Sequence, residues 1–457
     1  MIKVFLLIFL SGFTITRALQ LPPEPKYPTN VCSEIKAALK ENPIGYLPDS
    51  DESKLDTKRL QQELDKCGSG NAVKLVKGDG NAFLSGPLVI PSEVTLWIDE
   101  GVTLFASRNP RDFDRESYSC GVLADNSDGC FPLIRVMDGR NTAIVGEGVI
   151  DGRGGQKMIG YDETWWELSI RAEREISNQS CPRLIVVEKS QDFVLYRIRL
   201  HNSPYYHFVT EDVVGLLVWG VRVETPTAAY PEGLRARNTD GFDPNGRDMV
   251  FTQCYIKAGD DSIAIKGQHY PVANVLIQDN RFYKGHGISI GSEINEGAVN
   301  VTVKNLSIEG AENGIRIKSD ASKGGHVRDI YYENICIRDT DVPLIFDTYY
   351  TDKNDSKIPK FDNIHVKDVH ILSSRNKTVV FRGYNQATPV NISLDNVVSD
   401  IELTDLLALN AVIRLGPGNV SGIPLETDVQ KNVEILDHRE KSTPVDCSSM
   451  FVPFPFP

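Results

Sequence analysis

Most of this chain is a succession of short β-rich runs separated by Gly, Asn and Asp, and this pattern constrains the fold more than any other feature. The runs hold strands of about three to six residues, and they cover 88–107, 142–154, 184–203, 215–226, 249–267, 274–292, 299–310, 313–320 and 329–341. Three polar markers within them, Asp261, His286 and Arg316, follow one another at intervals of 25 and 30 residues. Such a period is typical of one coil of a parallel β-solenoid, in which each coil stacks on the last. We therefore expect an all-β solenoid, with a β-sandwich or a propeller as the alternative.

One segment, residues 56–70, has the pattern of a helix. Its sequence DTKRLQQELDKCGSG begins with Asp-Thr, places Leu60 and Leu64 four residues apart, and reaches Gly68 just after the last turn. We expect this short helix to cover the open end of the first coil, where an unpaired sheet edge would otherwise invite aggregation. Residues 19 to about 50 and the Pro-rich tail are expected to be extended wrappings. No linker divides the chain, so we predict a single domain over 19–457.

The N-terminus predicts export from the cell. Residues 1–18 combine one Lys, an apolar run over residues 4–13 and the small-x-small site Thr16-Arg17-Ala18, which is typical of a signal peptide. A membrane anchor would need about 20 apolar residues. The eight Cys agree with an extracellular, disulfide-bonded protein. The pairs Cys32/Cys67 and Cys120/Cys130 bracket short stretches that a disulfide could close; the pairing of Cys181, Cys254, Cys336 and Cys447 stays open. Asn-x-Ser/Thr sequons, which predict a glycoprotein, lie at Asn178, Asn300, Asn305, Asn354, Asn376, Asn391 and Asn419.

A formal charge of −13 argues against two classes of partner, nucleic acids and anionic membranes, because both favour a basic surface. A polyanionic substrate is disfavoured by the same global charge. If such a substrate binds, its cationic partners must be gathered locally in a cleft.

Four polar clusters recur on neighbouring coils, and stacking brings them together at about 4.8 Å per coil. They are Asn238-Thr239-Asp240, Gly259-Asp260-Asp261, Gly285-His286-Gly287 and Arg316-Ile317-Lys318. Because carboxylates placed close together cannot all ionise easily, one is expected to stay protonated as an acid while the others activate water. An acid and a base on either side of a bond are the requirement of glycoside hydrolysis. Turn-forming aspartates and a calcium site are the alternatives.

The strand pattern around the basic pair is clear, whereas the pattern around the histidine is not. Alternation in GIRIKSD puts Arg316 and Lys318 on one face and the two Ile on the other. A regular strand would turn His286 inward with Ile288, unless the flanking Gly285 and Gly287 break the alternation. Taken alone, His286 is more often a structural residue than a catalytic one.

In this order, the four clusters resemble the motifs of the polygalacturonases, glycoside hydrolase family 28. The motifs are NTD at 238–240, GDD at 259–261, GHG at 285–287 and RIK at 316–318, and weaker similarity extends from about residue 55 to 397. The resemblance implies a right-handed parallel β-helix, a pectin or polygalacturonate substrate, and no metal or other cofactor. A Ser at 262, where the family often has Cys, indicates that one usual disulfide is missing.

Carried over residue by residue, the resemblance implies a role for each matched position. Asp260 is the general acid, and Asp240 and Asp261 together activate the attacking water, with inversion of configuration. His286 sits against the acid and sets its protonation. The remaining matches concern the substrate: Arg316 and Lys318 bind the galacturonate carboxylate, Tyr350 lines the cleft, and Asn238 shapes the turn that presents Asp240.

The resulting hypothesis is a secreted, monomeric endo-polygalacturonase that cleaves α-1,4-galacturonosyl linkages, with a plant inhibitor protein as a possible partner. Exo action is the first alternative, because it depends on loops that the sequence does not reveal. Enzymes of the family that act on rhamnogalacturonan or xylogalacturonan lack the full carboxylate-binding pair. Two alternatives from other functional classes are an inactive pectin-binding homologue and a calcium-dependent pectate lyase.

Overall fold

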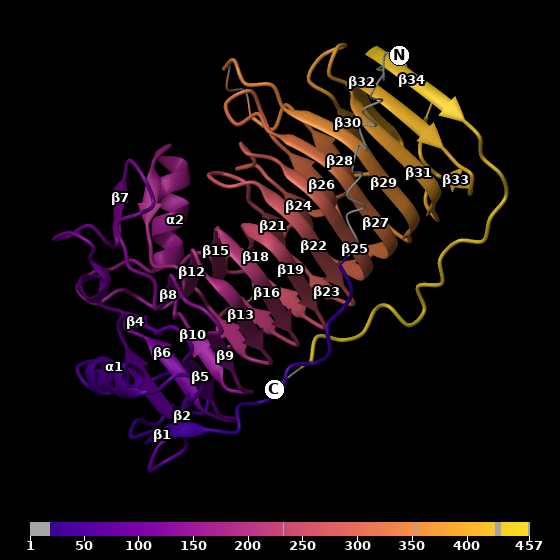
Figure 1. Cartoon of the computed structure of the whole chain (residues 1–457). Coiled ribbons are helices and arrows are strands. Elements are labelled where there is room, and N and C mark those ends of the chain that lie inside the picture. Colours follow the sequence, from indigo (N-terminus) through magenta and orange to yellow (C-terminus); the bar gives the residue numbers. More distant parts are fainter. Residues whose placement is uncertain (1–18, 232, 352, 354, 426–430, 456–457) are drawn as a thin grey trace, which may run out of the picture.

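The computed structural model describes residues 19–231, 233–351, 353, 355–425 and 431–455. The chain winds into a long parallel β-helix in which nearly every strand pairs in parallel with the equivalent strand of the coil before and the coil after (Figure 1). The predicted all-β solenoid is therefore confirmed. The proposed signal peptide, residues 1–18, lies outside the described residues. No described helix is long and apolar enough to cross a membrane.

The strands form three columns along the solenoid. The first column, here called the site face, contains β4 (Leu88–Val89), β8 (Ile134–Met137), β12 (Ile185–Glu188), β15 (Phe208–Glu211), β18 (Phe242–Asp243), β21 (Ile263–Ile265), β24 (Ile288–Ile290), β26 (Asn313–Lys318), β28 (Val342–Asp347) and β30 (Thr378–Arg382). The second contains β1 (Val31–Lys36), β2 (Ala72–Val76), β5 (Thr95–Ile98), β9 (Ala143–Val145), β13 (Gln191–Tyr196), β16 (Val213–Trp219), β19 (Gly246–Thr252) and β22 (Val272–Gln278). The third contains β3 (Ala82–Ser85), β6 (Thr103–Ala106), β10 (Val149–Asp151), β14 (Arg199–His201), β17 (Arg222–Glu224), β20 (Tyr255–Lys257), β23 (Arg281–Tyr283) and β33 (Val420–Ser421).

In the last coils the second and third columns merge into long strands. These are β25 (Ala298–Glu309), β27 (His326–Arg338), β29 (Lys360–Ile371) and β31 (Val390–Ser399). Two further strands complete that end, β32 (Asp405–Leu415) and β34 (Lys431–Asp437). One small antiparallel pair, β7 (Val122–Ala124) with β11 (Asn178–Ser180), stands apart from the solenoid.

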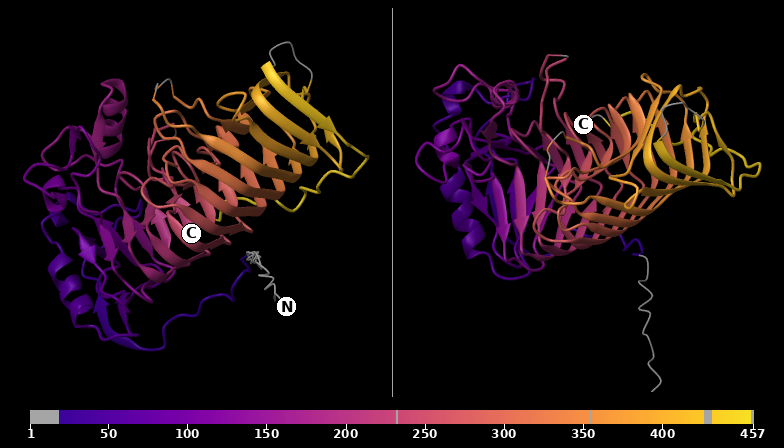
Figure 2. Two further views of the ribbon diagram at one scale, coloured as in Figure 1. Left: turned by 45° about the horizontal axis from the view of Figure 1, so that its top comes forward. Right: turned by 90° about the horizontal axis from the view of Figure 1, so that it is seen from above.

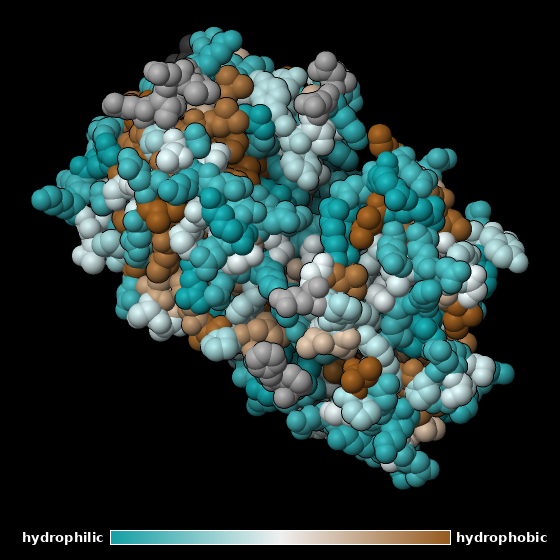
Figure 3. Space-filling model, turned by 180° about the vertical axis from the view of Figure 1, so that it is seen from behind, coloured by the Kyte–Doolittle hydropathy of each residue, from teal (hydrophilic) through white to brown (hydrophobic). Residues whose placement is uncertain are grey.

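Stacked apolar side chains fill the interior of the solenoid. On the site face Phe242 pairs with Ile263, which pairs with Ile288 and then with Ile315, and all four are fully buried. Successive coils there are 25 and 27 residues long, because the true partner of Arg316 is Ser289 and not His286. Burying one such side chain contributes about 1.5–3 kcal/mol, so the repeated rows dominate the stability of the fold. Seen from behind, the surface is mainly hydrophilic, with hydrophobic residues in separate groups (Figure 3).

Asparagine and aspartate side chains form ladders where the chain turns between strands. Asn300 donates to Asn274, which donates to Asp248, and all three residues have a left-handed backbone with φ between 56° and 58°. A second ladder runs from Asn334 through Asn305 to Asp279. Asn and Asp tolerate this conformation better than other residues with a side chain. Two sequon asparagines, Asn300 and Asn305, thus have side-chain amides that already donate hydrogen bonds at the partly buried turns.

In the part of the chain that the structure describes, two α-helices accompany the solenoid, of which the sequence predicted one. Helix α1 (Thr57–Lys66) buries Leu60 and Leu64 in the main core and lies beside the first coils (Figure 1). Helix α2 (Trp165–Arg174) contradicts the expectation of a single helix. Its signal was present, because Thr164 and Glu167 form a capping box, the Ser/Thr-x-x-Glu pattern that marks a helix start. Single-turn 3₁₀ segments occur at Asp49–Asp51 and Pro110–Phe113.

The described residues contain three disulfides and an extended segment near each end of the chain. The expected pairs Cys32–Cys67 and Cys120–Cys130 are present, and Cys336–Cys447 ties the C-terminal tail to β27. The remaining two, Cys181 and Cys254, are buried free thiols. Residues 19–30 run extended along the solenoid as predicted (Figure 2), but residues 31–36 differ from the expectation because they pair with β2 as the strand β1.

Candidate active site

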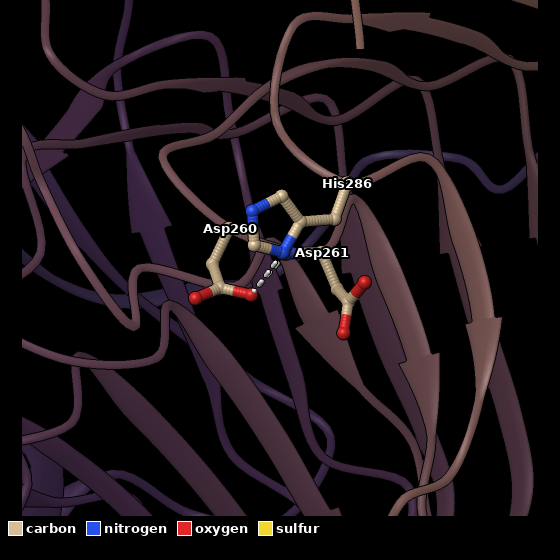
Figure 4. Close-up of side chains that lie close together, drawn as sticks. All are labelled: Asp260, Asp261 and His286. Atoms are coloured by element: carbon tan, nitrogen blue, oxygen red, sulfur yellow. Dashed lines mark hydrogen bonds and ion pairs between the residues drawn. The ribbon is translucent and has the colours of Figure 1, made fainter. Parts of the chain in front are cut away.

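The predicted polar clusters meet on the site face, just before strands β18, β21 and β24. The backbone N–H of Gly241 donates to the carbonyl of Asp261, and that of His286 donates to the carbonyl of Asp260. Asp240, Asp261 and His286 are therefore carried on three successive coils, one above the other. Figure 4 shows the His286 ring against Asp260, with Asp261 beside them.

Asp261 is held by the basic pair of β26. Its two carboxylate oxygens accept separately, Oδ1 from Arg316 Nη2 at 2.6 Å and Oδ2 from Lys318 Nζ at 2.9 Å. Ser289 adds a third hydrogen bond at 2.7 Å. Burial would raise the pKa of Asp261, but the charges of Arg316 and Lys318 outweigh burial and bring that pKa far below its ordinary value. Asp261 is thus ionised in the free protein, and the charges of Arg316 and Lys318 compensate its negative charge.

Arg316 and Lys318 share the outward face of β26, as alternation predicted, yet they are not open to solvent. Only 6% of Arg316 and 5% of Lys318 is exposed. Lys318 also lies over the ring of Tyr350, with Nζ 5.1 Å from the centroid. Tyr350 itself is 44% exposed, so its ring is accessible next to the basic pair.

Asp260 and His286 form a second charged pair. His286 Nδ1 lies 2.9 Å from Asp260 Oδ1, and His286 Nε2 lies 3.1 Å from Glu312 Oε2. Burial lowers the pKa of His286, but hydrogen bonds to the two carboxylates outweigh it and raise the pKa to about 9. At neutral pH the imidazole is therefore charged.

The conformation of the GHG motif explains how His286 reaches Asp260. Both Gly285 and Gly287 have a φ of 65°, in the left-handed region, and β24 starts only at Ile288. The alternation that would turn His286 inward is broken. A Cβ on Gly285 would meet the carbonyl oxygen of Asp260 at 2.3 Å, so the close stacking requires glycine.

Asp260 is ionised in the free protein, contrary to what a general acid needs at the moment of reaction. Burial raises the pKa of Asp260, whereas the hydrogen bond and charge of His286 lower it, and the net shift is downward. Two backbone N–H groups also donate to this carboxylate, from Asp261 at 2.9 Å and from Asn238 at 3.2 Å. Asn238 has a left-handed φ of 56°, a turn geometry that aims its N–H at Asp260. The proton of the pair therefore rests on His286.

Asp240 lies in an environment opposite to that of Asp261. It is 3% exposed, and its Oδ1 has no hydrogen-bond partner among the described residues. Burial raises its pKa well above the ordinary value, and the neighbouring Asp243 raises it further. Asp243, 2% exposed and with its own Oδ1 unpartnered within the described chain, has a pKa raised by burial to about 7. Within this site the raised pKa values thus belong to Asp240 and Asp243.

Sequence reasoning missed Asp243, Glu312, Lys266 and Glu293. Asp243 follows the inward Phe242 on β18, so alternation alone would have placed it on the same outward face as the cleft. Lys266 pairs with Glu293 at 3.0 Å, and its positive charge lowers the pKa of both Asp240 and Asp243. Glu312 had no motif to reveal it.

A cleft of 660 Å³ is lined by Asn238, Asp243, Lys266 and Glu293, next to the three aspartates in the chain. The stacked rings of Tyr205 and Tyr206, 3.9 Å apart between centroids, are also part of its lining. Residues 125–128 and 177–179, around β7 and β11, form one wall. In Figure 1 this arm, with α2, rises above the strands at the N-terminal end of the site face.

Asp260, Asp261 and His286 offer ligand atoms within 4.8 Å of one another, a spacing that a metal ion could use. The donors are poorly suited to it. Both oxygens of Asp261 already accept from cationic groups, and both nitrogens of His286 face carboxylates. A metal ion would have to displace two salt bridges and deprotonate the imidazole.

Comparison with known proteins places this arrangement in a family. The family model for glycosyl hydrolases family 28 matches residues 67–405. A polygalacturonase from Ralstonia solanacearum is 38% identical over 97% of this chain and 94% of its own length. An endo-polygalacturonase from Pectobacterium carotovorum subsp. carotovorum is 39% identical over 82% of this chain and 88% of its own. Among solved structures, the polygalacturonase from Erwinia carotovora ssp. carotovora has a TM-score of 0.79 and 36% identity, covering 87% of this chain and 100% of that one.

Proposed function

The chain belongs to glycosyl hydrolase family 28, and we propose that it is an endo-polygalacturonase, which hydrolyses the α-1,4-galacturonosyl linkages of polygalacturonate. The observation that carries this proposal is one cluster of Asp240, Asp260 and Asp261 beside the basic pair Arg316 and Lys318. The carboxyls are the acid and base that glycoside hydrolysis requires, and the basic pair suits an acidic sugar. Endo action is favoured over exo action by the relative named endo-polygalacturonase, 39% identical over most of both chains.

In this proposal Asp260 is the general acid and protonates the glycosidic oxygen. The pair of Asp260 and His286 holds one proton in the free protein, on Nδ1 of the imidazole. When the substrate excludes water, transfer of that proton to Oδ1 leaves two neutral groups, which a low-dielectric site favours over an ion pair. His286 is then the proton reserve of the acid.

Asp240 and Asp261 activate the attacking water. Asp261 is a weak base while Arg316 and Lys318 hold it. A galacturonate carboxylate that binds this basic pair competes with Asp261 for the same cations, so substrate binding makes Asp261 more basic. Asp240, with its raised pKa, is the stronger base of the two once it is ionised. A water on the opposite face from the acid gives inversion.

The substrate-binding residues follow from the same geometry. Arg316 can hold a sugar carboxylate through two N–H groups, and Lys318 adds a point charge. The exposed ring of Tyr350 beside Lys318 offers a face on which a sugar ring can stack. Asn238 acts as a positioning residue, since its backbone N–H donates to Asp260.

Several further features belong to the same proposal. Residues 1–18 act as a signal peptide, the protein works outside the cell as a glycosylated monomer, and residues 19–457 form one catalytic domain. The three disulfides support an oxidising compartment. A plant inhibitor protein is the protein partner in this proposal.

The experiment is incubation of the secreted protein with polygalacturonate, with products resolved over time. Early mixed oligomers are the expected result, and monomer alone would indicate exo action. An unsaturated product that absorbs in the ultraviolet would indicate a lyase instead. No new reducing ends from a folded sample, as judged by circular dichroism, would contradict the enzyme proposal and favour a pectin-binding homologue.

A further inference from the structure

A second pocket lies away from the site face, where the second column of strands turns into the third. Its volume is 450 Å³. The lining residues come from four successive coils and from the extended N-terminal segment, and they include Glu24, Arg197, Arg199, Trp219, Arg222 and Tyr255. None of these residues lines the catalytic cleft.

Two arginines in this pocket lie side by side without an acidic partner. Arg199 on β14 and Arg222 on β17 are register partners, so their Cα atoms are separated by about 4.8 Å, the spacing of neighbouring strands. Within the described residues neither side chain forms an ion pair or a hydrogen bond, whereas the nearby Arg197 takes both Glu24 and Glu147. Burial and the positive charge of Arg222 lower the pKa of Arg199 by more than the charges of Glu147 and Glu100 raise it.

The other cations along this edge are paired or covered. Lys257 on β20 pairs with Glu224 at 3.1 Å and faces the ring of Phe454. Arg281 on β23 donates to the carbonyls of residues 280 and 305. The C-terminal tail covers this part, with Tyr283 donating to the carbonyl of Val452.

The N-terminal segment covers the opposite part of the same edge. Tyr27 stacks on Trp97, and Tyr196 donates to Glu24. Figure 1 shows both terminal segments running along this side of the coils. Arg199 and Arg222 thus occupy an opening between two covered stretches.

We propose that this arginine pocket binds an acidic oligosaccharide through two neighbouring sugar carboxylates, and so holds a polygalacturonate chain outside the catalytic cleft. The inference rests on the proposed function for its ligand class. A guanidinium group binds a carboxylate through two parallel hydrogen bonds. A chain of uronic acids repeats its charge at sugar-length intervals, which are of the same order as the spacing of about 4.8 Å between coils. Trp219 and Tyr255 add aromatic rings to the lining, and such rings suit the apolar faces of sugars.

The global charge gives such a site a use. A protein with a formal charge of −13 repels a polyanion except where cations are concentrated. A second anchoring point raises the effective concentration of the polymer near the cleft without any change in the chemistry. The benefit should appear with long chains and disappear with short ones.

Calorimetric titration with a short oligogalacturonate tests the pocket, in an Asp260→Asn background that prevents turnover. The expected result is two binding sites per chain, and one site after the double change Arg199→Ala and Arg222→Ala. The matched control is Arg247→Ala with Arg328→Ala, two exposed arginines on other surfaces, which removes the same charge and should keep both sites. Arg222→Gln, a milder change, should weaken the second site if the double variant does not fold.

Two further titrations test whether the pocket prefers sugar carboxylates to other anions. Inorganic phosphate should compete poorly, and a fully methyl-esterified oligomer should leave the second site empty. A second site that survives the double change, is lost equally in the control, or is absent from the Asp260→Asn parent would overturn the inference. Phosphate binding as tight as the oligomer's would reduce the pocket to a simple anion site and overturn it as well.

Failure of this inference can be distinguished from failure of the enzyme proposal. With Asp260 intact, the double variant should cleave short oligomers at the parent rate and long polygalacturonate more slowly by about two- to tenfold, the loss expected for one modest contact. An inactive parent that still binds the oligomer at the arginine pocket would contradict the proposed function and leave this inference standing.

Discussion

Two halves of one acidic cluster differ in almost every electrostatic respect. Asp261 has a cation on each oxygen and a pKa far below the ordinary value. Asp240, one coil earlier, has an oxygen without a described partner and a pKa raised by burial and by Asp243. Both are aspartates of nearly equal burial, so the difference comes only from their neighbours. The comparison teaches that stacking supplies proximity, while the neighbouring coils decide which carboxyl holds a proton.

The largest expected effect is on the acid. Asp260→Asn keeps the size of the side chain but cannot deliver a proton, so turnover of polygalacturonate should fall by about 10²–10⁴-fold. Binding of an oligogalacturonate should persist. Release of reducing ends, together with calorimetric binding, checks both expectations. Turnover within about tenfold of the parent would show that the acid is another residue.

The second largest effect is expected on stability, when one ion pair of Asp261 is removed. Arg316→Ala leaves a buried carboxylate with one cation fewer, which should cost about 3–5 kcal/mol of unfolding free energy. The matched control is Arg328→Ala, an exposed arginine paired with Asp329, which should change stability by less than about 1 kcal/mol. Denaturant unfolding measures both. Equal losses of unfolding free energy in the two variants would mean that the buried Arg316–Asp261 pair contributes no more than the exposed pair of Arg328 and Asp329.

The third effect concerns the alkaline side of the pH profile. Because the pKa of His286 is raised to about 9, its charged form contributes stability below pH about 6.5, and that contribution is lost as the pH rises through 9. The value of kcat/KM should fall over the same range, as the pair with Asp260 loses its proton. His286→Gln should abolish that limb and lower kcat. An unchanged alkaline limb in the variant would contradict the role of His286 as proton reserve.

The smallest expected effect is on the pH dependence of stability, and it tests the raised pKa of Asp243. Its pKa of about 7 in the folded state lies above the ordinary value, so ionisation of Asp243 destabilises the protein as the pH rises from about 4 to 7. Asp243→Asn removes this loss. At about pH 4 the variant and the parent should have similar stability, and at about pH 7 the variant should be more stable by at least about 1 kcal/mol. Thermal unfolding at both values measures the difference, and a variant less stable at the higher pH would reverse the sign and refute the assignment.

Much of the fold and part of the site could be predicted from the sequence. The period of the β-runs is a local property, so it indicated the solenoid, and two disulfides lay close enough in sequence to be recognised. Cys336–Cys447 joins residues 111 apart, which no local pattern reveals. Helix α2 was missed although its capping box was present, because the surrounding strands dominated the pattern.

The protonation states could not be predicted, because they depend on contacts between coils. The sequence indicated that one of three aspartates should hold a proton and, through the resemblance, assigned it to Asp260. In the free protein Asp260 is ionised beside a charged His286, and the raised pKa belongs to Asp240 and Asp243. Glu312, which helps charge His286, lies in no motif. The resemblance assigned Arg316 and Lys318 to the substrate carboxylate, and their ion pairs with Asp261 in the free protein were not predicted.

The most direct test of this asymmetry is an infrared difference spectrum of the free protein across the neutral pH range. The account predicts a protonated carboxyl band that persists at about pH 6, above the ordinary range of aspartate, and that weakens in Asp243→Asn while remaining in Asp261→Asn. A spectrum without such a band, or a band lost in Asp261→Asn and kept in Asp243→Asn, would contradict it.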